Sequence, residues 1–182
     1  MKLSPYGTKP KSYLPFTDKE LEALFAQKMP DSHRLLLEIL ATSGMRLDEA
    51  ALLNWEEIKE EGGVVFFDLT GHYKPIKTIG SRRKVPVPEV LLSKIETGKT
   101  GQIFPEFKRN ADGKAQGPAS KALMPYVRKV TEDTRKTLHS LRGTLKDRLR
   151  DAGVSKETND FITGHGTGDV AGKYGKGPSL KV

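Results

Sequence analysis

The chain has 182 residues, of which 36% are hydrophobic and 30% are charged, a composition typical of a globular protein rather than a disordered one. Thirty-one Lys and Arg residues against 23 Asp and Glu give a net charge of +8, so a polyanion such as nucleic acid is an expected partner. The absence of cysteine excludes disulfides and thiolate metal sites, and no apolar run approaches the ~20 residues of a membrane span.

The N-terminal third is predicted to be a linker followed by two helices. Residues 1–16 contain three prolines and several lysines, and they are expected to form an extended linker or strap. A Thr-x-x-Glu capping-box pattern predicts a helix start near Thr17, and Pro30 ends that helix. A second helix is predicted directly after Pro30, with Gly44 as its left-handed C-cap.

The next segment reads Gly-Met-Arg-Leu-Asp-Glu and is predicted to open a third helix, capped by Asp48. Arg46 then lies just before a helix N-terminus, where backbone N–H groups already favour an anion. An ordinary surface arginine at a turn is the alternative interpretation of Arg46. Glu49 lies between apolar positions and would need a cationic partner if it is buried there.

Residues 63–88 are predicted to be the strand-rich section of the chain. Residues 63–69 are β-branched and aromatic, which favours a strand. Residues 76–79 and 82–87 are predicted to pair as a hairpin that turns at Gly80 and Ser81.

A helix near residues 88–96, a polar glycine-rich loop over 98–117 and a helix over 119–130 are predicted next. We expect the loop to be mobile and free to meet the backbone of a nucleic acid. The candidate contacts to that backbone, taken from this loop and from the hairpin, are Arg82, Arg83, Lys84, Lys108 and Arg109.

The C-terminal part carries two further predicted helices and a set of polar residues. Ser140 begins the first of these helices, which runs to about Ala152, and the second is capped by Ser155 and ends at Gly164.

Three polar groups and a tyrosine follow one another in this region. His139 and Arg142 are three residues apart, so on a helix they share one face, and His165 and Tyr174 come later in a glycine-rich run. Donors that converge on one point beside a phenol suggest a phosphate site with a hydroxyl nucleophile.

The ordered set His-x-x-Arg, Gly-His and a tyrosine nine residues later resembles the catalytic half of the tyrosine recombinases, also called phage-type integrases. Gly-x-Arg-x-x-Glu around Arg46 resembles the first arginine box of that family. Residues 77–86 resemble its Lys-Thr-x-x-Ser-x-Arg-x-Val-Pro hairpin pattern, and this match selects Lys77.

The resemblance implies an α+β fold, mostly α-helical, in which a helical catalytic domain carries a small three-stranded antiparallel sheet. It places the catalytic domain at residues 17–182, and the family's N-terminal core-DNA-binding domain is expected to be absent from this chain. Three features depart from the family pattern: Gly143 after the arginine, the glycine-rich run over 166–173, and a tail of only eight residues after Tyr174.

The resemblance also implies a site-specific recombinase that cuts and rejoins double-stranded DNA through a 3′-phosphotyrosine, for integration or excision of a phage or mobile element. It implies bacterial or phage-infected cytoplasm, a homotetramer for the full-length protein and a monomer for the isolated domain. Neither a metal nor a cofactor is implied, because cationic side chains supply the positive field. The implied catalytic residues are Arg46, Lys77, His139, Arg142, His165 and the nucleophile Tyr174, with Glu49 in support.

Three other functions stay open at this point. A type IB topoisomerase uses the same chemistry without a partner site. A non-catalytic DNA-binding module could keep the fold, and a basic protein could bind another anion such as RNA. A catalytic domain alone is expected to bind DNA weakly and with a steep dependence on salt.

Overall fold

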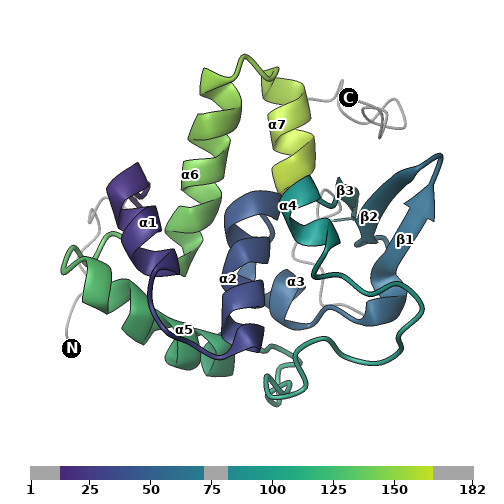
Figure 1. The fold of residues 1–182 in the computed structure, drawn as a ribbon, viewed down its shortest axis with the longest axis horizontal. Helices are drawn as coiled ribbons and strands as arrows, with labels where there is room; N and C mark the ends of the chain where they lie inside the picture. Colours follow the sequence, from purple (N-terminus) through teal and green to yellow (C-terminus); the bar gives the residue numbers. More distant parts are fainter. Residues whose placement is uncertain (1–12, 72–81, 166–182) are drawn as a thin grey trace, which may run out of the picture.

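The computed structural model describes residues 13–71 and 82–165, which form a helical body with a small sheet on one side (Figure 1). The elements in chain order are α1 (Asp18–Phe25), α2 (Asp31–Ser43), α3 (Leu47–Ala51), the 3-10 turn η1 (Trp55–Glu57), β1 (Ile58–Glu61), β2 (Val64–Asp68), β3 (Lys84–Pro86), α4 (Glu89–Leu92), α5 (Gln116–Val130), α6 (Leu138–Asp151) and α7 (Lys156–Thr163). The predicted α+β class is confirmed, and helices predominate. No helix within the described ranges is long and apolar enough to cross a bilayer.

Most helix ends lie where local sequence signals predict them. Thr17 and Glu20 form the predicted capping box of α1, with the Thr17 amide donating to the Glu20 carboxylate at 2.7 Å. α2 begins directly after Pro30 and ends at Gly44, which has the left-handed φ of 63°. Ser155 caps α7 by accepting a hydrogen bond from the Thr158 amide.

One predicted cap is wrong. Asp48 lies inside the first turn of α3, whose N-cap is Arg46. The Asp48 carboxylate instead accepts from the backbone amides of Ala115 and Gln116, at 2.9 and 2.6 Å. It therefore caps α5, which is distant in sequence and begins three residues before its predicted start at Ala119.

Three other helices differ from their predicted limits. α1 ends at Phe25, five residues before Pro30, which was predicted to end it. α4 has only four residues and ends at Leu92, four before the predicted end. α6 begins at Leu138, two residues before the predicted start, because Thr137 and Ser140 form a capping box. His139 therefore lies in the first turn of α6, with its amide donating to the Thr137 hydroxyl at 3.2 Å.

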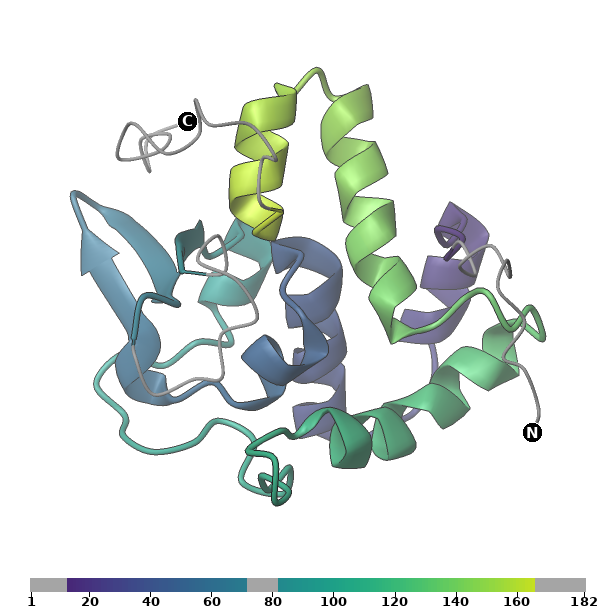
Figure 2. The same cartoon turned by 180° about the vertical axis from the view of Figure 1, so that it is seen from behind.

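The sheet is antiparallel with the order β1-β2-β3 (Figures 1 and 2). Phe67 of β2 pairs with Ile58 on one side and with Val85 on the other. β1 was not predicted, because after Ile58 it consists of exposed charged residues, Lys59 to Glu61, which carry no strand pattern. The strand predicted at 76–79 and its turn at Gly80 and Ser81 lie outside the described residues.

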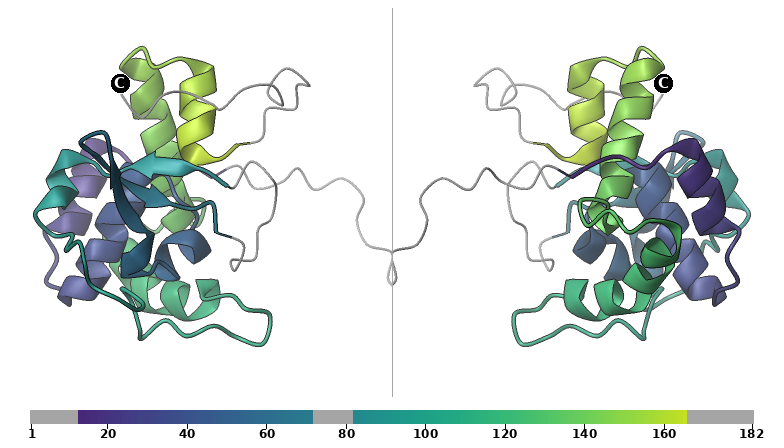
Figure 3. Two further views of the ribbon diagram at one scale, coloured as in Figure 1. Left: turned by 90° about the vertical axis from the view of Figure 1, so that its right-hand side faces the viewer. Right: turned by 90° about the vertical axis from the view of Figure 1, so that its left-hand side faces the viewer.

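Helix α2 forms the centre of the core and packs against α3, α5 and α6. Figure 3 shows α6 and α7 rising together above this layer while α5 runs beneath it. The buried side chains of α2 include Leu36, Leu37 and Ile39, which meet Leu123 of α5 and Leu141 of α6 in one apolar cluster. Full burial of each such side chain stabilises the fold by roughly 1.5–3 kcal/mol.

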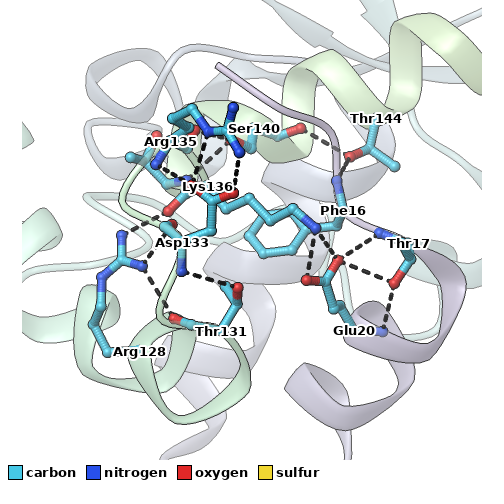
Figure 4. A network of polar contacts seen from close by, with 11 residues as sticks. Phe16, Thr17, Glu20, Arg128, Thr131, Asp133, Arg135, Lys136, Ser140 and Thr144 are labelled. Atoms are coloured by element: carbon cyan, nitrogen blue, oxygen red, sulfur yellow. Dashed lines mark hydrogen bonds and ion pairs between the residues drawn. The ribbon is translucent and has the colours of Figure 1, made fainter. Parts of the chain in front are cut away.

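The end of the predicted strap packs on the domain rather than hanging free. The Phe16 ring is buried and its amide donates to the Thr144 hydroxyl of α6 at 2.8 Å (Figure 4). The Leu14 amide donates to the Arg135 carbonyl at 3.3 Å. Beside these contacts Lys136 pairs with Glu20 at 2.6 Å, so α1 and the segment before α6 are joined at the same place.

Candidate active site

The site is built around two glycine turns, one at the end of α2 and one at the end of α7. Gly44 and Gly164 both have φ of 63°, a backbone conformation that favours glycine. A Cβ on Gly44 would lie 2.9 Å from the Thr163 side chain, and a Cβ on Gly164 would lie 2.5 Å from the Arg83 guanidinium. Each turn therefore needs glycine for its backbone and for the close approach of its neighbour.

The carbonyl groups of these two turns are acceptors for two arginines. Arg142 donates through Nη1 to the Gly44 carbonyl at 2.6 Å, and Arg46 donates through Nη2 to the Gly164 carbonyl at 3.0 Å. The ends of two helices thus fix guanidinium groups that come from α6 and from the start of α3. This arrangement brings together residues nearly 120 positions apart in sequence.

Glu49 lies between two arginines. Its carboxylate accepts from the Arg46 guanidinium at 2.8 Å and from the Arg46 amide at 2.9 Å. The same carboxylate accepts from Arg83 Nη2 at 3.0 Å. The sequence-based expectation that a buried Glu49 needs a cationic partner is confirmed, and the structure supplies a second one in Arg83.

Arg142 and His165 form a direct pair. Arg142 Nη2 lies 2.8 Å from His165 Nδ1. Because a guanidinium can only donate, Nδ1 must be the nitrogen that carries the lone pair, and Nε2 then carries the proton. His165 therefore offers an N–H donor on the side opposite Arg142.

Burial and positive charge shape the titration of this pair. Arg142 is only 2% exposed, and burial together with the charges of Arg46 and Arg83 lowers its pKa to about 10. His165 is exposed, yet desolvation by the protein around its imidazole, followed by the charge of Arg142, lowers the pKa of His165 to about 4. At neutral pH the arginine is therefore charged and the histidine is neutral.

The pKa of Glu49 moves in the direction that keeps it ionised. Burial alone would raise this pKa, but the charge and hydrogen bond of Arg83, followed by the contacts of Arg46, hold it below its ordinary value. Glu49 is thus an anion set among three guanidinium groups, those of Arg46, Arg83 and Arg142, and the positive charge of the cluster exceeds its negative charge.

A second group of ion pairs, centred on Asp160, holds α7 in place. Asp160 is buried and accepts from Lys146 at 3.0 Å and from Lys156 at 2.6 Å. The Asp160 carbonyl accepts from the His165 amide at 2.9 Å. The same residue therefore anchors the helix and the backbone that carries the imidazole.

His139 lies one helical turn before Arg142 on α6, as its spacing predicts. Its ring is tilted against the ring of Tyr13, with 5.0 Å between ring centres. The strap therefore touches one of the predicted catalytic residues.

The basic residues near the sheet do not share one environment. Arg83 is 2% exposed, and its Nε donates to the Ile162 carbonyl at 2.8 Å, so the prediction that it contacts the DNA backbone is wrong. Lys84 is half-buried on β3, pairs with Glu61 and lies 4.7 Å from the centre of the Phe66 ring. Arg82 is exposed, as a backbone contact requires.

The first part of the loop before α5 packs on the protein, and the part that follows it is exposed. Phe104 and Phe107 are buried, and the Ile103 amide donates to the Leu53 carbonyl at 2.9 Å, so the expected mobility does not extend to this part. Lys108 and Arg109 follow on the exposed part of the loop.

Two predicted catalytic residues, Lys77 and Tyr174, lie outside the described residues. The structure thus brings Arg46, Arg142 and His165 together with Glu49. Within the described ranges no three His, Asp or Glu side chains gather in a group that could hold a metal ion.

Sequence reasoning missed the place of Arg83 in this cluster. One signal was available, because Arg83 occupies the arginine position of the hairpin pattern over residues 77–86. The two glycine carbonyls carried no such signal, since any residue has one. Chemically, the cluster combines clamped guanidinium donors with a neutral imidazole donor, which suits an anion such as a phosphodiester.

Comparison with known proteins agrees with this chemistry. The sequence model described as "Phage integrase family" matches residues 15–176. No curated protein sequence matches the chain.

Solved structures show the same fold. The Tn1549 transposon integrase, residues 82–397, in complex with circular intermediate DNA is 22% identical, with a TM-score of 0.57 over 88% of this chain and 61% of that one. The catalytic domain of bacteriophage HP1 integrase is 18% identical, with a TM-score of 0.57 over 86% and 83%. A lambda integrase dimer bound to a COC′ core site is 18% identical, with a TM-score of 0.60 over 92% and 49%. The chain thus spans about six tenths of the solved Tn1549 chain and half of the solved lambda chain.

Proposed function

Because this chain belongs to the phage integrase family, we propose that it is the catalytic part of a site-specific recombinase that cuts and rejoins DNA through a 3′-phosphotyrosine intermediate. The observation that carries the proposal is the meeting of Arg46, Arg142 and His165 from three separate elements, with Glu49 holding the first of them. These are the residues that the family resemblance selects from the sequence.

In the proposed reaction the Tyr174 oxygen attacks the scissile phosphorus, and the bond from phosphorus to the 5′-oxygen breaks. The phenol proton leaves with help from His139, and Lys77 gives a proton to the departing 5′-oxygen. The products are a 3′-phosphotyrosine and a free 5′-hydroxyl, and the reverse attack by a 5′-hydroxyl from another strand completes the exchange. Because the covalent link keeps the energy of the broken bond, the reaction needs no nucleotide cofactor.

Arg46, Arg142 and His165 would act on the two non-bridging oxygens of the phosphate. Their charge increases as the fifth bond to phosphorus forms, so donors fixed in advance stabilise the transition state more than the bound substrate. The tautomer imposed by Arg142 leaves the His165 Nε2–H as such a donor. Loss of one donor of this kind typically costs ~100 to 1,000-fold in rate.

The partner of this reaction is double-stranded DNA, and the net charge of +8 fits that partner. The Tn1549 and lambda proteins with the same fold were solved in complex with DNA. We place the reaction in a bacterial or phage-infected cell, where it would integrate or excise a phage or mobile element, with four copies of the full-length protein in the synaptic complex.

A covalent-trapping experiment tests the proposal. The protein is incubated with a pool of nicked duplexes whose sequence is randomised around the nick, so that cleavage releases a short strand and prevents rejoining. We expect a protein–DNA adduct that survives denaturation in detergent and is absent from Tyr174→Phe.

The possible results separate the proposed function from its alternatives. An adduct that persists in Tyr174→Phe contradicts the assignment of the nucleophile, and no adduct from any sequence favours a non-catalytic DNA-binding module. The recovered sequence is then placed in two plasmids. Exchange between them supports a recombinase, whereas relaxation of supercoils without exchange favours a topoisomerase.

A further inference from the structure

Arg83 is a buried arginine that contacts two parts of the site at once. Its Nη2 donates to Glu49 at 3.0 Å, and its Nε donates to the Ile162 carbonyl in the last turn of α7 at 2.8 Å. Glu49 in turn holds Arg46, and α7 leads through Gly164 to His165. The Arg83 guanidinium, next to β3, therefore links Glu49 and Arg46 to the segment that carries His165.

We propose that Arg83 is a positioning residue for the reaction. Through Glu49 it sets the position of Arg46 and the positive field that Arg46 presents to the phosphate, and through the end of α7 it sets the turn that carries His165. This inference rests on the proposed function. It assigns Arg83 a role without contact to the DNA, since the guanidinium is enclosed in the protein.

The first effect of Arg83 concerns the positive charge that reaches the phosphate. Glu49 accepts hydrogen bonds from both Arg46 and Arg83. If Arg83 were removed, the carboxylate would lose one of its cationic partners and cancel more of the charge of Arg46. With Arg83 in place the carboxylate is shared, so Arg46, whose side chain is 27% exposed, keeps a positive field toward a bound phosphate.

The second effect of Arg83 is steric. A Cβ on Gly164 would lie 2.5 Å from Arg83 Nη1 and 2.8 Å from its Cζ, so the arginine fills the space against this glycine. Two of its bonds hold it there, and it therefore cannot move aside at low cost. The carbonyl of the same glycine accepts from Arg46, so both arginines lie against Gly164.

The test compares Arg83→Met and Arg83→Lys with Arg34→Met. Arg34 is a matched control, because this half-buried arginine also bridges two segments, donating to the carbonyls of Phe25 and Gln27 at 2.7 and 2.8 Å, and it joins α1 to α2 away from the site. Lysine keeps the charge but cannot donate to Glu49 and Ile162 in the same fork.

Each variant is assayed for adduct formation on the sequence recovered with wild-type protein, once with a normal phosphodiester and once with a methylphosphonate at the scissile position. Misplacement of a catalytic group by about 1 Å can cost ~100-fold, so we expect that loss for Arg83→Met and about tenfold for Arg83→Lys. The neutral methylphosphonate needs less positive charge, so the loss should shrink to about tenfold or less there. Arg34→Met should show no difference between the substrates.

A second readout does not depend on activity. Nitrogen NMR of the free protein reports the Arg46 guanidinium and the tautomer of His165. We expect both signals to change in the Arg83 variants and to stay unchanged in Arg34→Met, while His33, which contacts Tyr126 on another face, serves as an internal reference.

The results separate the two proposals. Equal losses on both substrates, or unchanged Arg46 and His165 signals in Arg83→Met, would overturn the positioning role. If wild-type protein forms no adduct, the recombinase function fails, and the NMR comparison alone decides whether Arg83 sets Arg46 and His165. If Arg83→Met does not fold, Arg83→Lys supplies both readouts.

Discussion

Arg142 is a charged group enclosed by neutral acceptors. Within the described residues Arg142 donates to the Gly44 carbonyl and to the His165 imidazole, and the nearby Glu49 carboxylate acts on it through its charge. Enclosing a guanidinium in this way is costly unless its donors are matched. The Nε of Arg142 is buried and finds no acceptor in the part of the chain that the structure describes. The residue thus holds positive charge in a fixed place, which is what stabilising a phosphate in a transition state requires.

The lowered pKa of His165 predicts how stability depends on pH. Its pKa is about 4 in the folded protein against an ordinary value of 6.5, so between these values the unfolded chain binds more protons. The neutral His165 imidazole does not oppose folding at neutral pH. As the pH falls from about 6.5 to about 4, protons bind the unfolded chain first, and the free energy of unfolding therefore decreases.

The variant His165→Gln provides the comparison, because its amide oxygen can accept from Arg142 but does not titrate. Melting temperatures of wild type and variant are measured at neutral pH and at about pH 5. We expect the wild type to lose more than the variant on acidification. Carboxylates titrate in both proteins and cancel, so an equal loss in the two would contradict the lowered pKa.

Glu49 supports a second prediction, about charge balance. Replacing Glu49 by Gln removes the carboxylate between Arg46 and Arg83 and leaves the positive charges of the cluster unbalanced. Breaking a buried pair in this way costs roughly 3–5 kcal/mol, and since the Glu49 side chain is 14% exposed we expect a loss near the lower figure.

Thermal melting with added sulfate identifies the cause. An anion in the site would replace the missing charge, so sulfate should raise the melting temperature of Glu49→Gln more than that of the wild type. Sodium chloride at matched ionic strength is the control. If sulfate raises both melting temperatures equally, the lost stability does not come from charge imbalance in the site.

At the scale of elements, contacts between distant segments decide where helices begin and how they are joined. Asp48 caps α5 from the first turn of α3, and the Thr144 hydroxyl of α6 holds the backbone of the strap at Phe16. In each case a polar side chain satisfies a backbone N–H group far away in sequence. Such a contact fixes the relative position of two elements as well as the end of one of them.

The cap on α5 can be tested by Asp48→Ala, with Asp48→Asn as its matched control. Alanine leaves the amides of Ala115 and Gln116 without an acceptor, and loss of a cap typically costs about 1–2 kcal/mol, or roughly 3 to 6 °C in a chain of this size. Asparagine keeps a side-chain oxygen and should cost less. Equal losses would mean that the charge of Asp48, rather than its hydrogen bonds, stabilises α5.

At the scale of the whole molecule, net charge determines how the protein meets its partner. A charge of +8 spread over 182 residues attracts the DNA backbone without reading its sequence. Arg83 and Arg142 contribute little to such an encounter because they are enclosed, so exposed residues such as Lys108 on the loop must supply much of it.

Salt dependence measures this contribution. If about six phosphates are contacted, affinity for a DNA duplex should fall ~1,000-fold between about 50 and about 200 mM salt. Lys108→Ala should reduce the slope of log affinity against log salt by ~0.9. Lys94→Ala removes the same charge but should leave the slope unchanged, because Lys94 is paired with Glu38 at 2.6 Å. A flat isotherm for wild-type protein would contradict the electrostatic account.

By itself the sequence determined what depends on neighbours along the chain. The capping box at Thr17 and the glycine stops at Gly44 and Gly164 follow from local backbone chemistry, and the class of the fold follows from the family resemblance. The order of arginine, histidine and tyrosine positions also sufficed to select the family and the candidate residues.

Only the tertiary structure decided which of these groups are enclosed and what they touch. Arg83 and Lys84 are adjacent in sequence, yet one is buried against Glu49 and α7 while the other lies at the surface of the sheet. Asp48 caps a helix nearly seventy residues away rather than its own. The physical reason is that burial and long-range hydrogen bonds depend on how helices pack, and no local pattern in the chain records that packing.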